Sequence, residues 1–136
     1  MIGDVWLCSG QSNMEYPLRR ALNGESEVAA ANDPQLRIVK IAQNATLDVD
    51  SGFAKPPQWR PVTPDSAKDF SAACYFMARD LRATQKVPIG AIDATWGGTP
   101  IRAWMGEEAV RATGGADAAE LVGLYRRDPF AATRAF

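Results

Sequence analysis

The chain has 136 residues, of which 46% are hydrophobic and 23% charged, and its formal net charge at pH 7 is −1. This composition is typical of a globular protein rather than a disordered chain, and the length suits one domain with a single core. Balanced, scattered charges exclude electrostatic capture of nucleic acid or an anionic membrane. No apolar run approaches the ~20 residues that span a bilayer, and the N-terminal residues lack signal-peptide features, which predicts a cytoplasmic product.

The first predicted element is an apolar strand that leads directly into a small polar turn. Residues 5–8, Val-Trp-Leu-Cys, form a continuous apolar run, which is typical of a strand buried on both faces of a parallel sheet. Gly10 then allows a sharp bend that leaves the Ser12 hydroxyl at the carboxyl edge of the sheet. A serine there is a candidate nucleophile, although the same pattern also occurs in plain turns and helix caps.

The rest of the chain alternates helical and extended patterns. In chain order, we predict a short helix on each side of the turn at 23–24, a strand at 36–42, an irregular proline-rich loop at 43–69, a helix at 70–84, a strand at 89–94, and short helices at 106–112 and 117–127. The 70–84 segment has one apolar stripe at helical spacing, and Asp69 is its predicted cap. Strand, helix and strand in this order predict a right-handed parallel crossover.

The two cysteines lie on different predicted elements. Cys8 is in the first strand and Cys74 is on the predicted helix, so a disulfide requires that these elements touch with suitable Cβ geometry. Free cysteines are often buried and behave as small apolar residues. The interpretation favoured by the sequence is therefore two buried, reduced thiols.

Two stretches resemble conserved blocks of one enzyme family. Residues 4–14, Asp-Val-Trp-Leu-Cys-Ser-Gly-Gln-Ser-Asn-Met, resemble the first block of the sialate O-acetylesterases and related carbohydrate acetylesterases of the SGNH-hydrolase superfamily. Residues 87–105, which contain Trp-Gly-Gly-Thr-Pro, look like the second block. The resemblance implies an α/β fold, a three-layer, flavodoxin-like parallel sheet flanked by helices. It also implies that residues 1–136 form a partial catalytic domain, the front half of that fold.

The resemblance implies a serine esterase that removes acetyl groups from a carbohydrate. Such a reaction needs a nucleophile, a base, and donors for the oxyanion of the tetrahedral intermediate. Ser12 would be the nucleophile and its backbone N–H one oxyanion donor, while Gly97 or Gly98 would give the second. On its own, the glycine pair is more typical of a plain strand-to-loop turn. No metal or organic cofactor is implied, and relatives are often secreted, periplasmic or lysosomal.

Four further side chains are candidates for substrate binding. Gln11 and Asn13 flank the predicted nucleophile, and either substrate contact or hydrogen bonding within the turn fits them equally well. Trp96 and Trp104 bracket the glycine loop and would offer a flat apolar wall to a sugar ring, although buried indoles that support the loop fit as well. The sequence does not decide which acetylated sugar would bind.

The chain contains no histidine, whereas the family's base is a histidine in an Asp-x-x-His block. A serine without a base attacks slowly at neutral pH, and Asp93 is interpreted as a strand-end residue rather than a base. The family's third block, with a Trp-x-Gln-Gly-Glu-like core, is also missing, and the strands that belong to these absent blocks would leave a sheet edge open, which invites pairing with another chain. We therefore expect a complementary polypeptide or self-association. The alternatives are a catalytically inactive carbohydrate-binding or interaction module and a truncated fragment.

Overall fold

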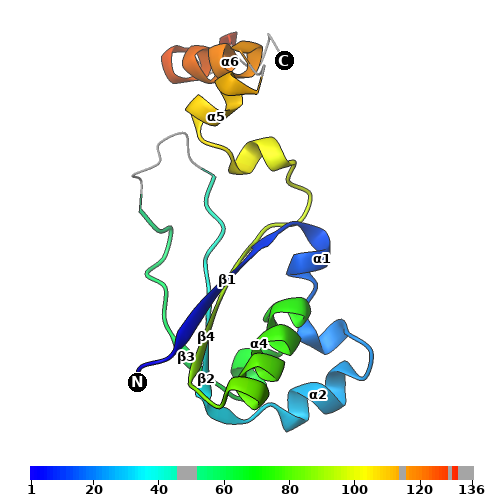
Figure 1. Cartoon of the computed structure of the whole chain (residues 1–136). Coiled ribbons are helices and arrows are strands. Elements are labelled where there is room, and N and C mark those ends of the chain that lie inside the picture. Colours follow the sequence, from blue (N-terminus) through cyan, green and yellow to red (C-terminus); the bar gives the residue numbers. More distant parts are fainter. Residues whose placement is uncertain (46–51, 114–115, 129, 132–136) are drawn as a thin grey trace. The chain divides into compact units, whose positions relative to one another are not determined.

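The computed structural model describes residues 1–45, 52–113, 116–128 and 130–131. They belong to two compact units. Unit 1 comprises residues 1–44 and 53–99, and unit 2 takes in the described residues of 45–52 and 100–136. Unit 1 contains the sheet, the first family block at residues 4–14, and the second block as far as Thr99. Unit 2 contains short helices (Figure 1). Across the described residues, no helix is long and apolar enough to cross a membrane.

The described part of unit 1 contains a four-stranded sheet in the order β1-β4-β2-β3 (Figure 1). The strands are β1 (Asp4–Gly10), β2 (Asp33–Lys40), β3 (Arg60–Val62) and β4 (Ile89–Thr95). Both β1 and β2 pair in parallel with β4, whereas β3 pairs antiparallel with β2. The α/β class is therefore confirmed, with a mainly parallel sheet. The three predicted strands all form, with β2 placed slightly earlier than the sequence indicated.

Short helices connect and cover these strands. Those of unit 1 are α1 (Ser12–Glu15), the 3-10 helix η1 (Leu18–Arg20), α2 (Gly24–Ala30), α3 (Pro64–Ala67) and α4 (Ala72–Gln85). The predicted helix at 70–84 is confirmed as α4, but its predicted cap is wrong. Ser71 caps α4, because its hydroxyl accepts from the Cys74 N–H at 3.2 Å. Asp69 instead pairs with Arg19 at 2.5 Å.

The predicted irregular loop at 43–69 is wrong in part. It contains β3 and α3, and α3 begins with a reciprocal capping box between Thr63 and Ser66 and with Pro64 in its first turn. Proline suits that position because it needs no N–H bond there. Residues 46–51 of this stretch lie outside the described residues.

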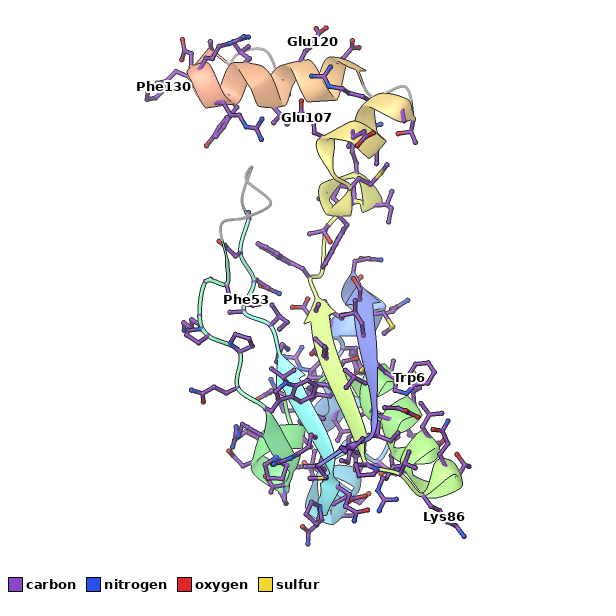
Figure 2. All side chains as sticks on the ribbon, turned by 60° about the vertical axis from the view of Figure 1, so that its left-hand side comes forward. Trp6, Phe53, Lys86, Glu107, Glu120 and Phe130 are labelled. Atoms are coloured by element: carbon purple, nitrogen blue, oxygen red, sulfur yellow. A yellow bond between two sulfur atoms is a disulfide. The ribbon has the colours of Figure 1, made fainter. Side chains whose placement is uncertain are left out.

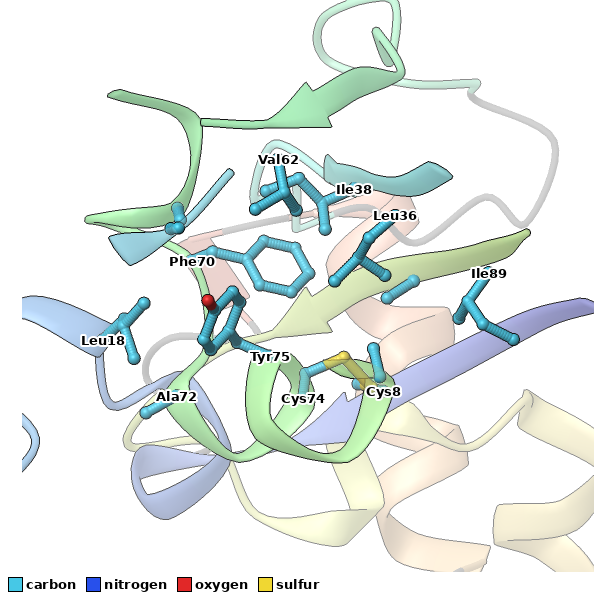
Figure 3. Packing of buried hydrophobic residues seen from close by; sticks show 14 residues of the cluster. Cys8, Leu18, Leu36, Ile38, Val62, Phe70, Ala72, Cys74, Tyr75 and Ile89 are labelled. Carbon is cyan, nitrogen blue, oxygen red and sulfur yellow. A yellow bond between two sulfur atoms is a disulfide. The ribbon is translucent and has the colours of Figure 1, made fainter. Parts of the chain in front are cut away.

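The core lies between the sheet and α4, which packs across β4 and β2 (Figure 1). Phe70, Leu36 and Ile89 are at most 2% exposed within this cluster (Figure 3). The predicted pair of reduced thiols is wrong, because Cys8 and Cys74 form a disulfide (Figure 3). Packing of α4 against the sheet brings the two Cα atoms to 6.0 Å, a separation that suits a bridge.

The prediction that the first strand is buried on both faces is also wrong. Cys8 is 4% exposed, but Val5 is 62% and Leu7 67% exposed, and Trp6 projects away from β1 (Figure 2). The physical reason is that, among the described elements, β1 contacts chiefly β4 and α1, so that little covers its face turned away from α4. Alternation then places Val5 and Leu7 on the face opposite the disulfide.

Unit 2 contains η2 (Ile101–Trp104), α5 (Glu107–Ala112) and α6 (Ala116–Arg127). The short helices predicted at 106–112 and 117–127 are thus confirmed. Glu107, labelled in Figure 2, accepts from Arg111 at 3.0 Å and from Arg126 at 3.2 Å, which links α5 to α6. The Arg111 guanidinium holds the pKa of Glu107 below its usual range.

Candidate functional site

The β1–β4 pairing brings the two predicted blocks together at the carboxyl ends of parallel strands. Gly10 lies opposite Thr95 in the register, and the Trp96 N–H donates to the Gly10 carbonyl at 2.9 Å, one step beyond the strands. A Cβ placed on Gly97 would lie 3.6 Å from the Ser12 Cα. The Ser12 turn and the glycine loop are therefore direct neighbours at the edge where open α/β sheets bind ligands.

The local backbone explains how Ser12 is presented. Gly10 has a φ of +137°, and a Cβ there would lie 2.9 Å from the Met14 Cγ. The Gln11 carbonyl accepts from the N–H groups of Met14 and Glu15 at 2.8 and 3.0 Å, so that Ser12 is the first residue of α1. Ser12 is exposed, and its hydroxyl donates to the Gln11 Oε1 at 2.5 Å. Gln11 thus orients the candidate nucleophile.

Gly10→Ala is expected to destabilise the chain by about 2 kcal/mol, because alanine would be strained at this φ and would collide with Met14. Urea unfolding followed by circular dichroism measures the change. Gly106→Ala is the matched control, since the Gly106 φ is −68° and a Cβ there meets nothing within 4 Å. Equal losses in the two variants would contradict a special requirement at Gly10.

A carboxylate that the sequence analysis missed joins the two turns. The Gly97 N–H donates to the Glu15 Oε2 at 2.6 Å, and the Gln43 Nε2 donates to the Glu15 Oε1 at 2.6 Å. Glu15 and Ser12 have the i, i+3 spacing that makes two residues neighbours on a helix, and this spacing is the one sequence signal that could have indicated Glu15. Gly98 has a φ of +77°, and a Cβ there would meet nothing within 4 Å. The oxyanion roles of both glycines stay predictions.

The other candidate residues occupy different surroundings. Asn13 is exposed on α1, and Trp96 is half-buried where its main chain extends the strand pairing. The Trp96 carbonyl also accepts from the Thr99 hydroxyl at 2.6 Å, which fixes the glycine loop from within. Trp104 is 41% exposed at the end of η2, in unit 2. The substrate-binding roles of Gln11, Asn13, Trp96 and Trp104 stay predictions.

The buried carboxylate of Asp93 stabilises the carboxyl edge of the sheet near the end of β4. Asp93 is fully buried, and its side chain accepts from the Thr95 hydroxyl at 2.6 Å and from the Ser71 N–H at 3.3 Å. The Lys40 Nζ lies 3.6 Å from the second Asp93 oxygen. Asp93 therefore ties the end of β4 to β2 and to the start of α4, in agreement with its interpretation as a strand-end residue.

A cleft of about 970 Å³ in unit 1 reaches Glu15. It is lined by Glu15, Ile38, Lys40, Ile41, Ala42, Gln43, Lys55, Pro56, Gln58, Arg60, Asp65, Ser66, Lys68, Asp69 and Phe70. Hydrogen bonds from Lys68 and Arg60 lower the pKa of Asp65 to about 2. Arg19 likewise lowers the pKa of Asp69. Both carboxylates are thus ionised and paired at neutral pH, which gives the cleft a polar, charge-balanced wall.

Comparison with known proteins gives one consistent family. The model of the family described as "Carbohydrate esterase, sialic acid-specific acetylesterase" matches residues 2–117. Sialate O-acetylesterase of Homo sapiens is 36% identical over 121 residues, which cover 84% of this chain and 23% of that protein. The Mus musculus protein is 32% identical over 122 residues, covering 84% and 22%. The crystal structure of a carbohydrate acetylesterase from Xanthomonas citri matches with a TM-score of 0.75 and 44% identity, covering 79% of this chain and 25% of that one.

These matches agree with the geometry at the sheet edge. The family match includes the Ser12 turn, the glycine loop and the strands that hold them together. The chain spans about a quarter of the length of the relatives that it matches. It belongs to the sialic acid-specific acetylesterase family of carbohydrate esterases.

Proposed function

We propose that this chain provides the nucleophile and part of the oxyanion hole of a serine esterase that removes O-acetyl groups from a carbohydrate such as an acetylated sialic acid. The observation that carries the proposal is the contact between the two turns, with the Trp96 N–H bonded to the Gly10 carbonyl and Gly97 packed against Ser12. Family membership supports the acetyl ester as the reacting group. The cleft beside Glu15 has a volume in the range of small-molecule sites and is proposed to hold the sugar.

The proposed chemistry proceeds through an acyl-enzyme. The Ser12 Oγ attacks the acetyl carbonyl and loses its proton to a base, and the carbonyl oxygen becomes an oxyanion. Backbone N–H groups of Ser12 and the glycine loop stabilise that charge. The C–O bond to the sugar then breaks, and the sugar oxygen takes the proton from the base. Water attacks the acetyl-serine in the same way, which releases acetate and restores the Ser12 hydroxyl.

The base is proposed to come from residues outside these 136, such as those of a complementary polypeptide. The 136 residues contain no histidine, and in the structure the Ser12 hydroxyl bonds to the Gln11 amide oxygen, which is too weakly basic to accept its proton. The exposed β1 side chains Val5 and Leu7 offer an apolar surface that a complementary polypeptide or a second copy would cover. Either partner would bury the exposed Val5 and Leu7 side chains. A second copy of these 136 residues contains no histidine, so that of the two only a complementary polypeptide would supply an imidazole.

A serine-directed phosphonate tests the proposed nucleophile. We expect the phosphorus to attach to Ser12, because the phosphonyl oxygen mimics the oxyanion, and peptide mass spectrometry locates the adduct. The chain is assayed alone and with any polypeptide that co-purifies with it, alongside release of p-nitrophenol from p-nitrophenyl acetate. Adduct formation at Ser12 with turnover supports the esterase. Neither event in the complete assembly would contradict it and favour a carbohydrate-binding module.

A further inference from the structure

We propose that Glu15 is a positioning residue for the reaction, because its carboxylate fixes the glycine loop against the Ser12 turn and leaves the Gly98 N–H, not that of Gly97, to meet the oxyanion. This inference rests on the proposed function, since it assigns a role within the same site. Its first basis is the Gly97 N–H, which donates to the Glu15 Oε2 at 2.6 Å. Charge-assisted bonds of this kind are short and strong.

Glu15 is well placed to hold the loop because both of its oxygens are engaged. The Gln43 Nε2 donates to the Oε1 at 2.6 Å, and the same Nε2 lies 3.5 Å from the Thr95 carbonyl oxygen. Gln43 follows β2, Thr95 ends β4, and Glu15 ends α1. One carboxylate thereby connects the segments that follow three different strands. Fixing both oxygens removes the rotamer freedom that would otherwise let the glycine loop shift.

The glycine at position 97 is explained by this carboxylate. A Cβ on Gly97 would lie 2.5 Å from the Glu15 Oε2, closer than a carbon and an oxygen that are not bonded to each other can approach. Any larger residue would therefore push the carboxylate away from the N–H. By contrast, a Cβ on Gly98 meets nothing within 4 Å, so that no side chain is excluded there by crowding. The two glycines thus serve different purposes, close contact at Gly97 and a left-handed bend at Gly98.

The hydrogen bond from the Gly97 N–H to Glu15 favours Gly98 over Gly97 as the oxyanion donor. An N–H that already donates to a carboxylate is poorly suited to a second, developing negative charge, and the nearby Glu15 charge would repel that oxyanion. Within the described part of the chain, no hydrogen bond occupies the Gly98 N–H. The positive φ of Gly98 turns the chain immediately after the anchored Gly97. Glu15 therefore acts through Gly97 to set the place of the Gly98 N–H.

Glu15→Ala is expected to slow phosphonate labelling of Ser12 by about 100-fold, through the rate of bond formation rather than the affinity for the reagent, as expected when a reacting geometry shifts by about 1 Å. Glu15→Gln retains an oxygen acceptor for the Gly97 N–H, and the Gln43 amide can turn its oxygen toward the new NH₂ group. This conservative variant is expected to label within about threefold of the wild type. Glu25→Ala, which removes an exposed carboxylate on α2, is the control and is expected to label normally.

Two further measurements separate positioning from simple destabilisation. The Gly97 amide hydrogen is expected to exchange with D₂O at least ~10-fold faster in Glu15→Ala than in the wild type, while core amides keep their rates. Gly97→Ala is expected to slow labelling as much as Glu15→Ala does, and the double variant to add nothing more, because both changes break the same contact.

The outcomes distinguish this inference from the proposed function. Equal labelling rates in wild type and Glu15→Ala, with both chains folded, overturn the role of Glu15 and leave the esterase standing. Unchanged exchange of the Gly97 amide in Glu15→Ala overturns it as well. Absence of labelling in the wild type, when it is assayed in the complete assembly, overturns the proposed function, and the role of Glu15 with it.

Discussion

In the complete assembly, Ser12→Ala is expected to lower acetyl-ester turnover by about 10⁴-fold, the size of effect that loss of a catalytic serine produces in other hydrolases. The change removes the hydroxyl that bonds to the Gln11 Oε1 at 2.5 Å and that would carry the acetyl group. Because Ser12 is exposed at the first position of α1, its replacement should change the free energy of unfolding by no more than about 0.5 kcal/mol. Steady-state hydrolysis of p-nitrophenyl acetate measures the first effect, and urea unfolding measures the second.

Ser9→Ala is the matched control for this variant. Ser9 is an exposed serine on β1, close in sequence to Ser12, and we assign it no part in the reaction. It should retain normal turnover and no adduct should form on it. Turnover by Ser12→Ala within about threefold of the wild type would remove Ser12 from its proposed role, because residual catalysis by the rest of a serine hydrolase site is orders of magnitude lower.

The double variant Cys8→Ala/Cys74→Ala is expected to lose about 4 kcal/mol of unfolding free energy, since the bridge closes a long loop in the unfolded chain. The sequence separation of the two cysteines is 66 residues. For a chain of this size, that loss corresponds to a fall in Tm of about 15 °C. Differential scanning calorimetry without reductant gives the measurement.

Reductant provides the internal control for the disulfide. Dithiothreitol should lower the Tm of the wild type toward that of the double variant and leave the double variant unchanged. Ser12 lies just beyond the end of the edge strand that carries Cys8, so that phosphonate labelling should also fall when the bridge is lost. A double variant that melts within ~2 °C of the oxidised wild type would show that the packing of α4 alone holds β1.

The elements that the sequence predicts well are those set by local patterns. The apolar stripe at 70–84 gives α4, and the short apolar run at 89–94 gives β4, because each pattern depends on neighbours within a few residues. The residue that caps α4 is Ser71 and not the predicted Asp69, whose carboxylate forms an ion pair with Arg19 instead. Boundaries thus depend on contacts that the local pattern does not contain.

Features that depend on contacts between residues far apart in the chain could not be predicted from the sequence. Strand order places β1 at an edge, and no pattern within Val5 to Cys8 records which neighbours that strand has. The disulfide likewise depends on how α4 lies on the sheet. At the site, the family resemblance led to Ser12 and to the glycine pair, but the Glu15 contact joins residues 82 positions apart. Such a contact becomes visible only after the β1–β4 register is known.

The disulfide also determines what a protease would release from this chain. A single cut at any peptide bond between Ser12 and Cys74 leaves two pieces that the bridge holds together. One piece carries Ser12 and the other carries Gly97, so both halves of the candidate site would stay covalently linked. The nicked chain should therefore migrate as one band on a non-reducing gel and as two bands after reduction. Nicking is thus compatible with an intact site, while nicking followed by reduction is not.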